Sequence, residues 1–93
     1  MTRLNVRYSK RFEKDLKLAV KRKYDVKKLK DVVILLMTGN PLPVKYKDHA
    51  LTGNYAKYRE CHIEPDWLLI YKIEFETLTL VLTRTGTHGD LFG

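Results

Sequence analysis

The spacing of apolar residues in the first part of the chain predicts one short strand followed by two helices. Residues 4–8 alternate between apolar and polar side chains, which is typical of a strand with one buried face. Residues 12–20 and 26–37 instead repeat their apolar positions three and four residues apart, the spacing of an amphipathic helix. Ser9 and Asp25 stand just ahead of these stripes, where each can cap a helix. The two helices therefore present an apolar side that the rest of the chain must cover.

The second half of the chain has the alternation and the composition of strands. A long connection over residues 40–54 comes first, and connections of this length are often functional. Three segments rich in strand-forming residues follow, separated by turns: 55–63, 67–74 and 78–85. Residues 88–93 are expected to form a short tail. The order of one strand, two helices and three strands predicts a single α+β domain over residues 1–93, with both helices packed on one face of an antiparallel sheet.

A chain of 93 residues builds one modest core. Eight apolar positions on the predicted stripes and strands are expected inside it: Leu16, Val20, Leu29, Val33, Leu36, Leu69, Ile70 and Leu80. The single cysteine, Cys61, is expected to be a core residue without a chemical role. The sequence contains no apolar run long enough for a bilayer, and its start lacks the apolar region of a signal peptide. We therefore expect a cytoplasmic protein without a membrane partner.

Positive charge is concentrated in the first third of the chain. Residues 1–30 carry 12 of the 18 lysines and arginines against three acids, hence a net charge of +9, whereas the remainder carries six bases and eight acids. A basic surface of this kind attracts polyanions, with nucleic acid first among them. A solvated helix face, or a surface that binds an acidic protein, would have the same sequence pattern.

The residues best suited to chemistry lie in the second half. Strand alternation places Glu60 and His62 on one face, because they are two residues apart. The same alternation places Arg84 on the face of Leu80 and Leu82 in the last strand. If neighbouring strands form simple hairpins, a group of polar side chains can meet at one end of the sheet: Glu60, His62, Asp66 and Arg84, joined by His49 from the long connection and His88 from the tail.

Such a group suits the cleavage of RNA by its own 2′-OH, which attacks the adjacent phosphate without a metal. The reaction needs a base, an acid and cations; histidine suits both proton roles, and arginine suits the phosphate oxygens. No paired-cysteine or HExxH spacing points to a metal site, and we expect neither a metal nor another cofactor. The residues alone also allow structural roles, with Arg84 paired to Glu60 and Asp66 shaping a turn.

Three motifs in the second half resemble those of the YafQ-type toxins of the RelE/ParE superfamily. They are residues 46–53 (YKDHALTG), 59–71 (RECHIEPDWLLIY) and 84–92 (RTGTHGDLF), in the order of the family and with nearly its spacing. The predicted element order, strand-helix-helix-strand-strand-strand, is also that of this RelE-like family. The resemblance covers essentially the whole chain, and it is specific from about residue 44 onward.

The resemblance implies the toxin of a type II toxin–antitoxin system. Such a toxin is a metal-independent endoribonuclease that cleaves mRNA in the ribosomal A site, leaves a cyclic phosphate and a 5′-OH, and inhibits translation. It also implies a set of partners: the mRNA substrate, the ribosome with its rRNA, and a cognate antitoxin that wraps the toxin and represses their shared operon.

The matching motif positions imply roles for particular residues. The catalytic set comprises His49, His62, Asp66, Arg84 and His88. Within it, His88 is the general acid and Arg84 binds the phosphate, while either Asp66 or His62 is the base. His49 is either a proton-transfer group or a donor to the transition state. Four further residues are implied to bind the substrate: Lys47, Arg59, Glu60 and Phe92, the last by packing against a base.

Two other functions use the same fold. ParE-like relatives poison DNA gyrase and generally lack this set of histidines and arginine, so its presence here argues against that activity. A non-catalytic RNA-binding domain would use the basic helices as its surface. A cleavage assay on a ribosome and a supercoiling assay on gyrase separate these alternatives.

Overall fold

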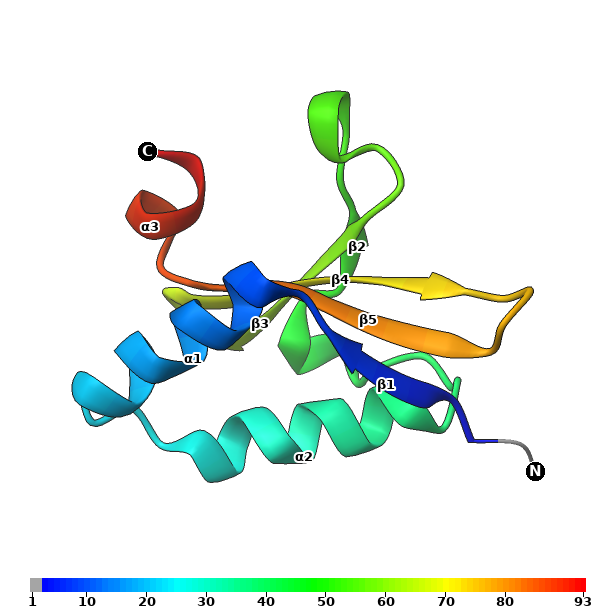
Figure 1. The fold of residues 1–93 in the computed structure, drawn as a ribbon, viewed down its shortest axis with the longest axis horizontal. Helices are drawn as coiled ribbons and strands as arrows, with labels where there is room; N and C mark the ends of the chain where they lie inside the picture. Colours follow the sequence, from blue (N-terminus) through cyan, green and yellow to red (C-terminus); the bar gives the residue numbers. More distant parts are fainter. Residues whose placement is uncertain (1–2) are drawn as a thin grey trace.

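The structure is a computed structural model and describes residues 3–93 of the chain. Five strands form one sheet in the order β1-β5-β4-β3-β2, and two of the three helices lie below it (Figure 1). The C-terminal helix and the loop between β2 and β3 rise on the other side. The elements in chain order are β1 (Asn5–Tyr8), α1 (Lys10–Lys21), α2 (Val26–Met37), η1 (Val44–Tyr46), β2 (His49–Ala50), η2 (Gly53–Tyr55), β3 (Arg59–Glu64), β4 (Trp67–Glu74), β5 (Thr79–Gly86) and α3 (His88–Phe92).

The predicted α+β fold is confirmed, with α1 and α2 on one face of the sheet. One strand pair differs from the prediction, because β1 runs parallel to β5 whereas the other pairs are antiparallel. Alternation along a strand predicts which face is buried, but it does not determine the direction of its neighbour. No hairpin joins β1 to β5, since all the other strands and both long helices lie between them in the sequence.

Local capping sets the start of both long helices, as predicted. The Ser9 hydroxyl accepts a hydrogen bond from the Phe12 N–H (2.9 Å), and the Asp25 carboxylate accepts one from the Lys27 N–H (3.1 Å). These side chains satisfy backbone donors that have no partner within the first turn of a helix. Gly39, with φ of +76°, follows α2 in the left-handed conformation that glycine adopts most easily.

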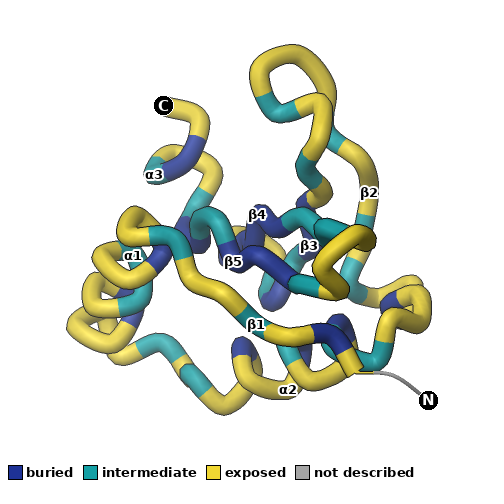
Figure 2. The backbone as a smooth tube through the Cα atoms, turned by 45° about the vertical axis from the view of Figure 1, so that its right-hand side comes forward, coloured by how far each residue is buried: buried dark blue, intermediate teal, exposed yellow. Residues whose placement is uncertain are grey.

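The core lies between the two long helices and the sheet, where Figure 2 shows buried positions along β4 and β5. Five of the predicted core residues are buried, and two, Leu16 and Val33, are partly buried; the five are Leu29, Leu36, Leu69, Ile70 and Leu80. The prediction for Val20 is wrong, because its side chain is 57% exposed. Helix α1 instead buries Phe12 and Ala19, and Val20 lies about 100° further round the helix than Ala19.

Three differences in the second half bear on function. The first of the predicted strands begins at Arg59 rather than at residue 55, and a two-residue strand, β2, forms inside the long connection. The predicted tail is a short helix, α3, held by a capping box between Thr87 and Asp90.

In the part of the chain that the structure describes, no helix is both long and apolar enough to cross a membrane.

The upper face of the sheet, opposite α1 and α2, carries a second and smaller apolar cluster. Leu68 and Ile70 of β4 pack there with Leu91 of α3, and Tyr55 and Tyr58 of the β2–β3 loop pack against them. This cluster fixes α3 and the loop to the same face of the sheet. The candidate site lies on that face.

Candidate functional site

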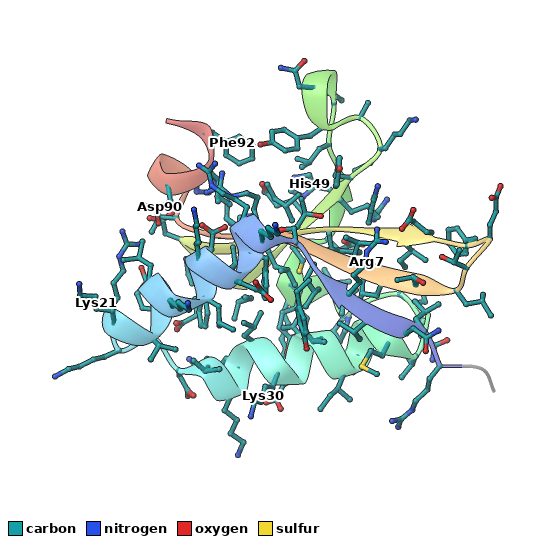
Figure 3. The ribbon with its side chains drawn as sticks, viewed as in Figure 1. Arg7, Lys21, Lys30, His49, Asp90 and Phe92 are labelled. Atoms are coloured by element: carbon teal, nitrogen blue, oxygen red, sulfur yellow. The ribbon has the colours of Figure 1, made fainter. Side chains whose placement is uncertain are left out.

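The three histidines come together on the upper face, although they belong to three elements. The ring centroids of His49 on β2 and His62 on β3 are 6.2 Å apart, and those of His62 and His88 on α3 are 5.9 Å apart. The Phe92 ring lies 6.4 Å from His88. Figure 3 shows His49 and Phe92 on the same side of the sheet. We call His49, His62 and His88 the histidine cluster.

Glu60 lies beneath two members of the histidine cluster. Its side chain is almost fully buried, and its Oε1 atom lies 3.4 Å from His49 Nε2 and 3.5 Å from His62 Nε2. His49 Nδ1 lies 2.8 Å from the carbonyl oxygen of Lys47. A carbonyl only accepts hydrogen bonds, so the Nδ1 atom of His49 donates in this contact. Both ring nitrogens of His49 therefore lie beside oxygen atoms that can accept a hydrogen bond.

Asp66 orients the ring of His88. Its Oδ1 atom accepts a hydrogen bond from the His88 backbone N–H (3.0 Å) and lies 2.9 Å from His88 Nδ1. These two hydrogen bonds, the backbone one first, lower the pKa of the Asp66 carboxyl. A carboxylate at Nδ1 fixes the orientation of the ring and leaves Nε2 free to exchange a proton.

Arg84 reaches the upper face through an irregularity in β5. Ile70 pairs with Arg84 and Tyr71 pairs with Leu82, so Thr83 is an extra residue, a β-bulge. The bulge interrupts the alternation, and the prediction that Arg84 shares the face of Leu82 is therefore wrong. Arg84 shares the face of Ile70 instead.

The charged partner of Arg84 is Asp15 of α1, not Glu60. Arg84 Nε donates to Asp15 Oδ2 at 2.8 Å and Nη2 donates to Oδ1 at 3.2 Å, while the Thr85 N–H also donates to Oδ2 at 3.1 Å. The side chains of Arg84 and Asp15 are only 14% and 11% exposed. The hydrogen bonds that Arg84 donates to Asp15 are the main cause of its raised pKa, and Tyr55 contributes. The ring centroids of Tyr55 and Phe92 are 5.9 Å apart. These two rings therefore connect Arg84 to the histidine cluster.

The remaining predicted site residues lie in different surroundings. Arg59 forms an ion pair with Asp48 (2.9 Å), and strand alternation turns it away from Glu60 and His62, so it is not part of the cluster. The Lys47 side chain is exposed at the end of η1, and its backbone is left-handed, with φ of +50°.

Sequence reasoning missed Asp15 and assigned Tyr55 to a strand. A signal for Asp15 was present, because it lies three residues after Phe12 and four before Ala19, on the buried stripe of α1. An acid on an apolar stripe requires a partner, since an unpaired buried charge is costly. Its partner lies 69 residues away in the sequence, and no local pattern identifies it.

Helix α3 is fastened to the rest of the molecule through Asp90. Arg22, at the end of α1, donates to both Asp90 oxygens at 2.6 and 3.2 Å, and the Thr87 N–H donates to Oδ2 at 3.0 Å. The Arg22 hydrogen bond, followed by that of Thr87, lowers the pKa of Asp90 well below its usual range. A Cβ atom on Gly86 would lie 2.9 Å from Asp90 Oδ2, so glycine lets the helix approach β5.

Replacing Asp90 with asparagine should loosen α3, because it removes the ion pair and weakens the capping box. We expect faster amide hydrogen exchange over residues 88–92 at neutral pH, together with slower catalysis, since His88 lies in this helix. In the unmodified chain, a lowered carboxyl pKa gives stabilisation that is complete above the ordinary value of about 3.9 and is lost as the pH falls below it. The protection of the α3 amides, expressed relative to their intrinsic exchange rates, should therefore change little between pH 7 and 5. A large loss of protection over this range would contradict the fastening by Asp90.

Comparisons with known proteins identify the family of this arrangement. Residues 4–93 match the family described as "Bacterial toxin of type II toxin-antitoxin system, YafQ". The chain is 48% identical to the mRNA interferase toxin YafQ of Escherichia coli K12, over the full length of both. The crystal structure of the E. coli DinJ–YafQ toxin–antitoxin complex is similar, with 48% identity, a TM-score of 0.88, and coverage of 98% of this chain and 99% of that one.

A further relative is a metal-bound toxin from Helicobacter pylori, with 49% identity and a TM-score of 0.90 over 96% of this chain and 99% of that one. Between residues 3 and 93 of the present chain, no three side chains of His, Cys, Asp or Glu are placed to hold a metal ion together. The reaction proposed for this site is therefore written with protein side chains alone.

Proposed function

This chain belongs to the YafQ family of toxins of bacterial type II toxin–antitoxin systems, and on that premise we propose that it is a ribosome-dependent mRNA interferase. It is an endoribonuclease that cuts mRNA and thereby inhibits translation. The observation that carries this proposal is the histidine cluster, with its carboxylate partners Glu60 and Asp66. Because mRNA and ribosomes are its targets, the proposed place of action is the cytoplasm.

The cleavage proceeds by proton transfer on either side of the phosphate. A base removes the proton of the 2′-OH, the 2′-oxygen bonds to phosphorus, and the bond from phosphorus to the 5′-oxygen breaks as an acid protonates that oxygen. The products are a 2′,3′-cyclic phosphate and a 5′-OH. His88 is the acid, since Asp66 holds its Nδ1 and leaves Nε2 free. His62 is the base, because the hydrogen bonds from His88 lower the pKa of Asp66 and make its carboxylate a weaker base.

Hydrogen-bond donors and an aromatic ring complete the site. His49 contributes a ring N–H donor, and Arg84 contributes the guanidinium donors that Asp15 does not occupy. Donors in fixed positions stabilise the charge that develops on the phosphate oxygens. Phe92 stacks on a base of the substrate, beside Tyr55.

A cognate antitoxin is the proposed protein partner, as in the DinJ–YafQ complex. An apolar groove of about 530 Å³ runs between α1 and α2, and it is lined mainly by Phe12, Leu16, Leu29, Val33, Ile34 and Tyr8. Lysines along both helices surround it. An acidic amphipathic helix matches both features, because its apolar face fills the groove while its acids meet the lysines. We propose that the antitoxin supplies such a helix.

Binding through the basic helices should depend strongly on salt. Five lysines are the proposed contacts to rRNA or to the antitoxin: Lys10, Lys14, Lys17, Lys21 and Lys28. Each neutralised phosphate releases counterions, so the affinity for ribosomes should fall linearly on logarithmic axes as salt rises, with a slope of roughly −0.7 per contact. Equilibrium binding between 50 and 300 mM salt, roughly the range in which such contacts weaken, measures the slope. If neither the affinity for the ribosome nor the affinity for the antitoxin changed with salt concentration, this role of the lysines would be contradicted.

A cleavage assay with mapped RNA ends tests the function itself. The purified chain is incubated with mRNA alone, with mRNA on a ribosome, and with gyrase and supercoiled DNA. We expect cyclic-phosphate and 5′-OH ends on ribosome-bound mRNA and no effect on gyrase. Gyrase inhibition without RNA cleavage would favour the ParE-like alternative, and RNA binding without cleavage would favour the non-catalytic one.

A further inference from the structure

We propose that Lys45 and Lys47 form a second phosphate-binding subsite, which takes a phosphodiester of the mRNA next to the scissile one. This inference rests on the proposed function and extends it to a surface beyond the histidine cluster. The subsite would hold the strand in register, while the cluster performs the cleavage.

The subsite lies in a groove of about 460 Å³ that opens beside His62. Lys45, Tyr46 and Lys47 line it from η1 and the residue that follows, and the other lining residues come from α2 and from the end of β3. The volume lies within the usual range for sites that bind small ligands, so it can admit one nucleotide. His62 belongs both to this groove and to the histidine cluster, so a strand bound at the cluster can continue into the groove.

The lysines of the groove differ in their availability. Lys28 Nζ lies 2.9 Å from Glu64 Oε1 and forms an ion pair with that carboxylate. Among residues 3–93, neither Lys45 nor Lys47 forms an ion pair with an acid. Asp31 of α2 also lines the groove, which therefore contains three lysines against two acids. The excess positive charge is supplied by Lys45 and Lys47, adjacent to the proposed path of the RNA.

The Lys45 side chain has a partner within η1, and the Lys47 backbone contacts the histidine cluster. Lys45 Nζ lies 5.0 Å from the centre of the Tyr46 ring, a cation–π contact, and that ring packs on the core. Lys47 adopts φ of +50°, a conformation that glycine or asparagine would take more easily. The backbone geometry of this turn therefore does not by itself favour lysine over other residues at position 47. The Lys47 carbonyl also contacts His49 Nδ1 (2.8 Å), so the same residue joins the groove to the cluster.

The test measures single-turnover cleavage of mRNA bound to a ribosome by the variant with Lys45→Ala and Lys47→Asn. Asparagine tolerates the left-handed backbone and removes the positive charge. We expect the apparent KM to rise about threefold per lysine, the scale of an exposed ion pair, with the cleavage step at saturation nearly unchanged. Lys27→Ala, which removes one charge from an exposed position outside the groove, is the matched control for each single lysine change and should raise KM less than either.

Asp31→Asn gives a test of opposite sign. Removing this acid makes the groove more positive, so the apparent KM should fall by about the same factor. A purely structural role of the groove would not improve substrate binding in this variant. An unchanged or raised KM, with the fold intact by circular dichroism, would argue against a phosphate at this place.

A set of mRNAs, each with one uncharged methylphosphonate linkage, identifies the source of the phosphate. If the lysines bind the mRNA, one linkage next to the cut should raise the KM of the unmodified chain and have no further effect on the double variant. Equal sensitivity of both proteins to every linkage would assign the lysines to rRNA and overturn the inference. If the unmodified chain cleaves mRNA but shows no such coupling, only this inference is wrong. If no cleavage occurs at all, the proposed function is wrong as well.

Discussion

Replacing His88 with alanine should slow the cleavage of ribosome-bound mRNA by about 10²–10⁴-fold, the usual contribution of one positioned proton donor. The ring of His88 is fixed by Asp66 at 2.9 Å and lies beside His62, so its loss removes the acid without disturbing the apolar clusters. Ribosome binding should hardly change, because Arg84 and the basic helices remain. Single-turnover kinetics at saturating toxin separate the cleavage step from binding.

The control for this experiment is Asp66→Asn. It keeps a hydrogen-bond acceptor at His88 Nδ1 but removes the negative charge beside the ring. We expect an intermediate loss of rate and a shift in the pH profile, which a purely structural role of Asp66 would not produce. If the double variant with His62→Ala and His88→Ala cleaved like the unmodified chain, the histidines would have no catalytic role.

The same assay with EDTA tests the absence of a metal from the reaction. Because the proposed steps use only side chains, chelation should leave the cleavage rate unchanged, provided that the ribosome keeps its magnesium. Full inactivation by EDTA with the ribosome intact would overturn the mechanism. The metal-bound relative makes this control necessary.

The second large effect is expected from Arg84→Ala, which should reduce both the cleavage rate and the stability of the fold. Loss of one electrostatic donor to a phosphate transition state costs about 10²–10³-fold in rate. The change also leaves Asp15, which is only 11% exposed, without its cation. Breaking a largely buried ion pair lowers the free energy of unfolding by about 3 kcal/mol. Urea denaturation measures the second effect independently of the first.

A double variant separates the two consequences. Adding Asp15→Asn to Arg84→Ala removes the uncompensated charge, so much of the lost stability should return while cleavage stays slow. Asp15→Asn alone should weaken the fold and leave Arg84 free, with a smaller loss of rate per folded molecule. Recovery of cleavage together with stability in the double variant would show that Arg84 acts only as a structural partner of Asp15.

Local interactions made several features of this protein predictable from sequence. The caps at Ser9 and Asp25 act within three residues, and the apolar stripes act within single turns, so both long helices could be placed. Glu60 and His62 share a face because alternation along β3 is regular at that point. The three motifs located the histidines along the chain, and they indicated the family that the comparisons establish.

Tertiary structure alone decided how those residues meet. Asp15 and Arg84 pair across 69 residues, and the bulge at Thr83 inverts the alternation that sequence reasoning extended to Arg84. The parallel pairing of β1 with β5, the exposure of Val20 and the docking of α3 likewise depend on which surfaces bury one another. Periodicity records the preference of a residue for burial, whereas the choice of partner depends on contacts between segments far apart in the chain. The sequence by itself therefore determined the helices and the chemical identity of the site residues, and only the packing of distant elements determined the geometry of the site.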